Sequence, residues 1–125
     1  MSQTNIIWDN NGLSYELDMQ DAETSERYES AFSKMAEREK LLPKDGASSA
    51  YIRAYHELFK NLFDDIFGEG SGSKIVGEKA NSRVCNEVYA SFLDFVAEQK
   101  NSQLEFNNNL VTRYSANRAQ RRAAK

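Results

Sequence analysis

Alternating apolar and polar positions near the N-terminus predict a β-hairpin at about residues 5–18. A short β-prone run, Ile6-Ile7-Trp8, precedes Asn11-Gly12, a dipeptide that tolerates the positive φ angles of a tight hairpin turn. After the turn, apolar residues alternate with polar ones, which is the period of a strand with one buried face. These apolar residues are Leu13, Tyr15 and Leu17. Because an isolated hairpin is only marginally stable in water, we expect its apolar face to pack on helices or on another subunit.

A narrow apolar stripe predicts a first helix from Asp21 to Leu42. Its apolar positions recur every three or four residues, which is the period of one helical face. Acidic residues fill the first turns, where the helix dipole favours them. The stripe consists of Tyr28, Phe32, Met35 and Leu42, with Glu39 before the last of them. Because the rest of the segment is polar, we expect this helix to pack along a thin seam.

A much wider apolar face predicts a second helix that starts after a cap at Ser48 or Ser49 and ends at Phe67. Gly68 follows and stops the helix. Its apolar face comprises Ile52, Tyr55, Leu58, Phe59, Leu62, Phe63, Ile66 and Phe67. This is the most hydrophobic part of the chain, so we expect it to supply the core.

A glycine-rich connector at residues 68–73 and a helical turn at 74–77 precede a third long helix that begins near Asn81 or Ser82. Its buried face is predicted to contain Val84, Cys85, Val88, Tyr89, Phe92, Phe95 and Val96. The pattern extends towards Leu110, although asparagines at 107–109 are poor helix formers. From Ser115 onwards no apolar stripe remains, which indicates a mobile tail.

Together these elements predict a mainly α fold of the α+β type, with an N-terminal β-hairpin, three helices and a basic flexible C-terminal tail. The 125 residues fit a single domain, placed at residues 1–112, with the tail at 113–125. No run approaches the roughly 18 apolar residues of a membrane helix, and no signal-peptide pattern opens the chain. We therefore expect no membrane partner. The single cysteine, Cys85, fits a reducing cytoplasm.

The formal charge of −3 hides two unlike parts of the chain. Residues 1–110 carry 11 basic and 19 acidic side chains, a charge of −8. Residues 111–125 carry five basic side chains and no acid, a charge of +5. The chain is therefore predicted to be an acidic body with a basic end, and these two parts should prefer surfaces of opposite sign.

The glycines at 68, 70 and 72 before Lys74 superficially match a phosphate-binding loop. A P-loop, however, has its lysine directly after the last glycine and lies between a strand and a helix. Here a serine intervenes and the segment follows a helix. A helix C-cap and a tight turn are the favoured interpretation.

Other candidate chemistry is sparse. The sole histidine, His56, and the sole cysteine, Cys85, cannot make a common zinc set. Cys85 lies on an apolar face, where a thiol usually serves as packing. Asp64 and Asp65 are adjacent on a predicted helix and point apart, which favours a solvated acidic edge. We therefore expect no enzyme activity, no catalytic residue, no metal and no cofactor.

The remaining features indicate protein interactions. The basic end can contact nucleic-acid phosphates, an acidic protein surface or a neighbouring copy. No aromatic residues interleave with it, so nucleic acid is not the expected partner. The thin seam of the first helix and the half-covered hairpin predict an interface, and a homo-oligomer would complete the core. The candidate interaction residues are Trp8, Tyr28, Phe32, Met35, Phe63, Phe67, Arg118, Arg121 and Arg122.

Two segments resemble small proteins encoded among the tail genes of phages and prophages of Gram-positive bacteria. Residues 63–70, FDDIFGEG, precede Lys74-Ile75-Val76-Gly77 and a cysteine-containing helix, in the order of that family's pattern. Val76 departs from the pattern, which has an aromatic residue there. Residues 114–122, YSANRAQRR, resemble an ending common in small phage tail proteins. The resemblance covers about half the chain, roughly residues 58–122.

This resemblance implies a non-enzymatic phage protein that acts in tail morphogenesis in the cytoplasm of the bacterial host. The role that the resemblance implies most directly is that of a tail assembly chaperone, which binds the tape-measure protein. Two alternatives stay open. One is a phage-encoded inhibitor of a host defence system or host enzyme, and the other is a minor virion structural or nucleic-acid-contacting accessory protein.

Overall fold

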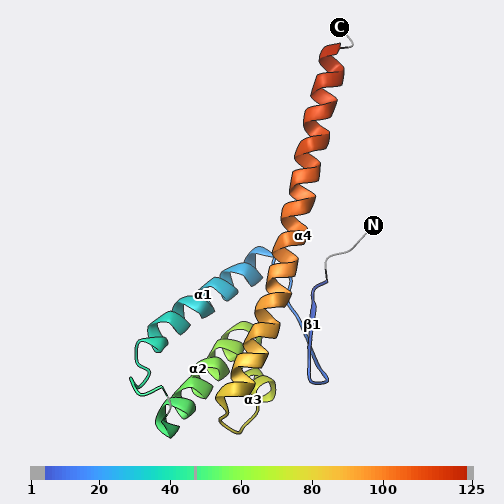
Figure 1. The fold of residues 1–125 in the computed structure, drawn as a ribbon. Coiled ribbons are helices and arrows are strands. Elements are labelled where there is room, and N and C mark those ends of the chain that lie inside the picture. Colours follow the sequence, from blue (N-terminus) through green and yellow to red (C-terminus); the bar gives the residue numbers. More distant parts are fainter. Residues whose placement is uncertain (1–4, 47, 124–125) are drawn as a thin grey trace.

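A computed structural model describes the backbone of residues 5–46 and 48–123, and the side chains of these residues as far as Arg113. The elements, in chain order, are β1 (Ile7–Asn10), β2 (Leu13–Glu16), α1 (Ala22–Glu39), α2 (Ser49–Phe67), α3 (Ser71–Val76) and α4 (Ser82–Ala123). The first half of α4 packs with the other elements into one body, and its second half projects away from them (Figure 1). The predicted fold class, mainly helical with an N-terminal hairpin, is confirmed.

The hairpin pairs β1 and β2 antiparallel, with Ile7 opposite Glu16 and Asn10 opposite Leu13. Asn11 and Gly12 form the turn with φ angles of 49° and 83°, the left-handed region that the Asn-Gly pair tolerates. The apolar face of the hairpin packs on the helices of the same chain rather than standing free. The hairpin is therefore part of the core.

Helix α1 begins where Asp21 caps it, because the Asp21 side chain accepts a hydrogen bond from the Thr24 backbone N–H at 3.0 Å. The helix ends at Glu39, three residues before the predicted Leu42. Only Ala31 and Met35 are buried along its length. The thin seam that the sequence predicts is thus the strip of α1 that meets α2 and α4.

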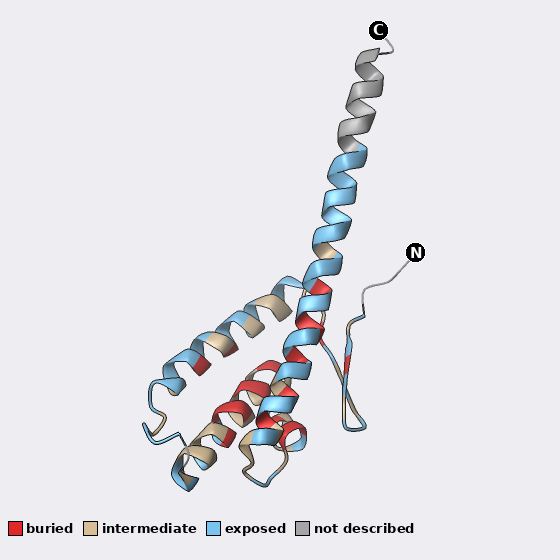
Figure 2. Ribbon diagram, viewed as in Figure 1, coloured by how far each residue is buried: buried red, intermediate tan, exposed pale blue. Residues whose placement is uncertain are grey.

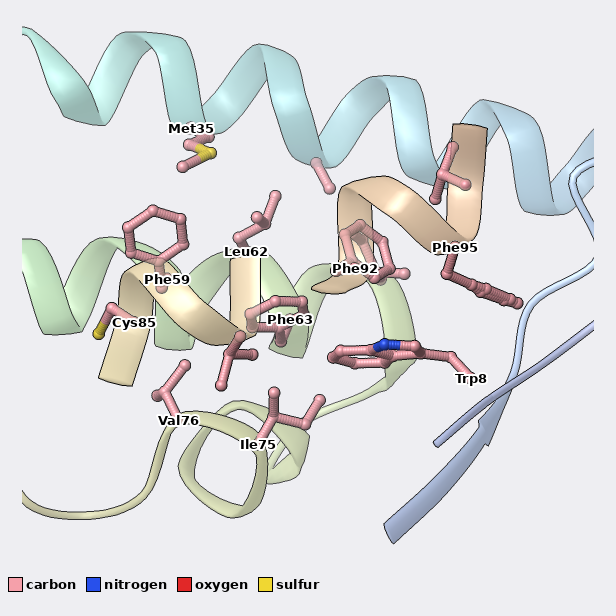
Figure 3. Packing of buried hydrophobic residues seen from close by; sticks show 14 of the residues in the cluster. Trp8, Met35, Phe59, Leu62, Phe63, Ile75, Val76, Cys85, Phe92 and Phe95 are labelled. Atoms are coloured by element: carbon pink, nitrogen blue, oxygen red, sulfur yellow. The ribbon is translucent and has the colours of Figure 1, made fainter. Parts of the chain in front are cut away.

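Helix α2 supplies the centre of the core. The Ser48 side chain caps it by accepting from the Tyr51 backbone N–H at 3.1 Å. Six of its residues are buried: His56, Leu58, Phe59, Leu62, Phe63 and Ile66. Figure 3 shows Phe59, Leu62 and Phe63 between the ribbons of α1, α3 and α4, with Trp8 entering from the hairpin. Burial of this wide apolar face is the main driving force for the fold.

A short helix, α3, forms where the sequence predicts a connector followed by one helical turn. It packs so closely on α2 that a Cβ added at Gly72 would lie 2.0 Å from the Lys60 carbonyl oxygen. Ile75 and Val76 anchor α3, each with 2% of its surface exposed. The body therefore contains four helices among the described residues, one more than expected, because the glycine lets a helical turn approach α2.

Helix α4 begins at Ser82, next to an N-terminal cap in which the Asn81 side chain accepts from the Arg83 and Val84 backbone N–H groups. Its helical backbone runs through Ala123, into the segment for which the sequence predicts a flexible tail. No glycine or proline interrupts residues 82–123, so the asparagines at 107–109 alone do not end the helix. Among the described residues, no helix combines the length and apolar character needed to cross a membrane.

Candidate functional site

Three of the predicted interaction residues lie in the protein's own core. Trp8 is 3% exposed, Met35 8% and Phe63 not at all. The Trp8 ring stacks on Phe63 at 5.7 Å between centroids and meets the edge of Phe92 at 5.2 Å. Its indole N–H donates to the Ser91 hydroxyl at 3.1 Å. The prediction that these three side chains face a partner is corrected, because the hairpin and α1 fold onto α2 and α4 and cover them.

The other predicted aromatic residues are partly buried against the same core. The ring centroids of Tyr28 and Phe32 on α1 are 4.6 Å apart, and those of Phe67 on α2 and Tyr15 of the hairpin are 4.9 Å apart. They therefore present only part of their surface. The side chains of the remaining candidates, Arg118, Arg121 and Arg122, lie outside the described residues, so their role stays a prediction.

Several exposed large apolar side chains lie elsewhere, on the part of α4 beyond the body. We call residues 101–113 of α4 the projecting segment. Its side chains are almost all exposed, as Figure 2 shows by the nearly unbroken pale-blue stretch of α4 beyond the body, where the red, buried positions lie. Four large apolar residues are among them: Leu104 at 59%, Phe106 at 65%, Leu110 at 54% and Val111 at 63%. The sequence pattern predicts that the third helix extends through Leu104, Phe106 and Leu110, but it does not predict that they are exposed.

These apolar side chains occupy two faces of the helix. Phe92, Gln99 and Phe106 are spaced by seven residues, so Phe106 continues the face that α4 buries in the body, and Leu110 follows one turn later. Leu104 and Val111 are also seven residues apart, but they lie on a different face. The apolar side chains of the projecting segment therefore do not form one continuous stripe.

The projecting segment carries little charge. Glu105 and Arg113 are its only charged residues, and most of the others are asparagine, glutamine, serine and threonine. Exposed large apolar side chains amid uncharged polar ones are typical of a protein interaction surface.

The glycine-rich turn between α2 and α3 does not hold an open phosphate loop. The Asp64 carboxylate accepts hydrogen bonds from the Gly70 and Gly72 backbone N–H groups, at 3.1 and 2.7 Å. These are the amides that a phosphate would need, and a carboxylate already occupies them. Asp65 pairs with Arg38 at 3.1 Å. The two acids are thus structural groups rather than the solvated edge expected from sequence.

Cys85 and His56 also have structural surroundings. Cys85 is fully buried, and this burial raises the pKa of its thiol to about 11, so it stays protonated at neutral pH. The His56 ring N–H donates to the Gly77 carbonyl at 2.7 Å and ties α2 to the loop after α3. Within the described part of the chain, no three histidine, cysteine or acidic side chains are placed to hold a metal ion.

Comparison with known proteins gives one match. A family described as a family of unknown function, DUF6673, matches residues 11–125, a range that includes all of α4. No curated protein and no solved structure matches the chain.

Proposed function

We propose, from the premise that this chain belongs to the DUF6673 family of unknown function, that it is a non-enzymatic protein that acts by binding another protein. The observation that carries this proposal is the projecting segment of α4. It holds four large apolar side chains in solvent, on the stretch of α4 that extends beyond the other described elements. Such a surface favours a partner that covers it.

The geometry suits a helical or hydrophobic client. A solitary helix with apolar residues spaced by four and seven positions can pack against another helix or enter an apolar groove. Phe106 and Leu110 share one face of this helix, and each would bury about half or more of its surface against such a partner. Burial of side chains of this size contributes about 1.5–3 kcal/mol each when complete.

We propose further that the client is a phage tail tape-measure protein and that the chain is a tail assembly chaperone. The support is the resemblance of residues 63–70 and 114–122 to small phage tail proteins, together with the apolar projecting segment. In this role the protein would keep apolar stretches of the tape-measure protein covered in the cytoplasm of the bacterial host until tail-tube subunits assemble around them.

The test is co-expression with the tape-measure protein of the same genome. We expect the two proteins to co-purify, and the tape-measure protein to stay soluble only when the chain is present. The double variant Phe106→Ser/Leu110→Ser should lose this complex while keeping its fold, because both side chains are exposed. The matched control is Leu41→Ser, which removes an apolar side chain that is 83% exposed in the loop after α1.

Two results would contradict the proposal. One is the absence of any complex with the tape-measure protein, and the other is a complex that survives the double variant unchanged. Capture of a host nuclease or signalling enzyme instead would favour the inhibitor alternative, for which the charge of −8 on residues 1–110 is the supporting observation.

A further inference from the structure

A cleft lined by aromatic and aliphatic side chains lies between α1, α2 and α4, on a different part of the molecule from the projecting segment. Its volume is about 280 Å³. The residues that define its character are Phe32 and Glu39 of α1, Tyr51, Tyr55 and Phe59 of α2, and Tyr89 of α4. Glu39 is the only charged group in the lining.

Three of the aromatic rings in the lining, Tyr55, Phe59 and Tyr89, pack against one another. Phe59, one of the lining residues, is 2% exposed. The centroid of the Tyr55 ring lies 4.8 Å from that of Phe59, with an angle of 78° between the ring planes. The Tyr89 ring lies at the same centroid distance from Phe59, with an angle of 55°. Both tyrosines are partly exposed, so the corner that they form with Phe59 opens to solvent.

Glu39 makes this corner electronegative. Burial raises the pKa of both Tyr55 and Tyr89, and the negative charge of Glu39 adds to the effect on each. The carboxylate therefore acts on the same rings that line the cleft. The ion pairs found among the described residues use other acids, namely Asp65, Glu37 and Glu57, and none uses Glu39.

The same aromatic cluster already holds a cation at its far end. The Lys100 ammonium lies 5.5 Å from the centroid of the Tyr28 ring. Tyr28 is next to Phe32 at 4.6 Å, and Phe32 is next to Tyr89 at 6.4 Å. A cation above an aromatic ring is attracted by the electrons of its face. The cleft is likewise lined by tyrosine rings, and it also contains the Glu39 carboxylate. Its lining includes no basic side chain.

We propose that this cleft binds an arginine side chain from residues 113–125 of a second copy of the chain. Charge complementarity favours this occupant, because these residues carry four arginines, one lysine and no acid, whereas the body is acidic. A planar guanidinium stacks on tyrosine rings and pairs with a carboxylate at the same time, which an ammonium does less well.

In the structure, the basic end of the same molecule lies far from the cleft. Tyr89 and Arg113 belong to one continuous helix and are 24 residues apart. At 1.5 Å per residue, about 36 Å of helix separates them, and the later arginines lie further away still. While α4 is helical along this length, the side chain has to come from another copy.

This contact is independent of the proposed function. It uses the cleft and the chain from residue 113 onwards, whereas client binding uses the apolar side chains at 104–111. Loss of one activity need not affect the other, so the two proposals fail separately.

The first test is sedimentation equilibrium of the full chain over a range of concentrations. We expect reversible self-association that weakens as salt is added. Glu39→Gln should raise the dissociation constant about fivefold or more, by removing the one charge in the cleft. The matched control is Glu37→Gln, since Glu37 is exposed on the same helix and pairs with Lys40. It should leave the dissociation constant unchanged.

The second test is complementation between two weakened variants. One variant is Glu39→Gln, and the other carries glutamine at Arg113, Arg118, Arg121 and Arg122. Each alone should associate weakly, but their mixture should associate more strongly, because the intact basic end of the first meets the intact cleft of the second. A mere effect on folding would not be relieved by mixing.

Three outcomes would overturn the proposal: a chain that stays monomeric at every concentration, an unchanged dissociation constant for Glu39→Gln, or a mixture that associates no better than its components. A monomeric chain whose cleft takes a basic segment of the tape-measure protein would assign the cleft to a different partner.

Discussion

Asp64 and Gly72 shape the turn from α2 to α3. The Asp64 carboxylate holds the Gly70 and Gly72 amides, and Gly72 in turn lies against the Lys60 carbonyl. A side chain at Gly72 would meet backbone atoms, which cannot move aside as a flexible side chain can. The turn thus depends on one missing Cβ and one carboxylate.

We predict that Gly72→Ala lowers the free energy of unfolding by more than about 2 kcal/mol, because α3 would have to move away from α2. Urea denaturation followed by the fluorescence of the buried Trp8 measures this change. Gly46→Ala is the control. No atom lies within 4 Å of a Cβ added there, so its effect should stay within about 0.5 kcal/mol. Equal stability of the two variants would contradict the close packing of α3.

At the scale of the element, the two halves of α4 have different surroundings: the first half packs in the core, and the second half does not. From Ser82 to Gln99 it is held by core contacts, and Gln99 itself is buried with its side chain bonded to the Met19 amide and the Leu17 carbonyl. Lys100 still lies over the Tyr28 ring, but the described side chains after it are almost all exposed. A helix without tertiary support is only marginally stable in water.

This division predicts different hydrogen exchange along one helix. In the monomer, amides of residues 103–113 should exchange within minutes, whereas amides of residues 88–99 should be protected at least a hundredfold better. Mass spectrometry of peptic fragments at low protein concentration measures both stretches in one sample. If the proposed client, the tape-measure protein, binds here, its addition should slow exchange in the projecting segment. Equal protection of the two stretches in the free monomer would show that α4 is supported along its whole length.

The whole molecule combines an acidic body with a long helix that carries a basic sequence at its far end (Figure 1). This arrangement places opposite charges far apart on one molecule. It discourages contact between the two ends of the same copy and favours contact between copies. The overall charge of −3 conveys none of this.

The shape itself is measurable. The 42 residues of α4 span about 63 Å at 1.5 Å per residue, while a compact domain of this length has a radius of gyration near 14 Å. Small-angle X-ray scattering of the dilute monomer in high salt should therefore give a radius of gyration well above 14 Å and a maximum dimension above about 60 Å. Values typical of a compact globule would mean that α4 bends back onto the body in solution.

Local signals in the sequence were enough to predict the hairpin, the first residues of the long helices and the helix that supplies most of the core. The Asn11-Gly12 turn, the Ser48 cap and the stop at Gly68 all lie where the pattern predicts, because each depends on residues close together in the chain. The apolar period also identified most of the buried face of α4. The match to DUF6673 adds membership of a family, without a function.

Only the tertiary structure decided which apolar side chains are covered. Periodicity shows that a residue belongs to a face, but burial depends on what lies opposite that face. Trp8 is therefore buried because α2 and α4 lie beneath the hairpin, and Phe106 is exposed although it continues the same face of α4 as Phe92. The cleft around Glu39 is formed by residues from three helices, and no local pattern could bring them together.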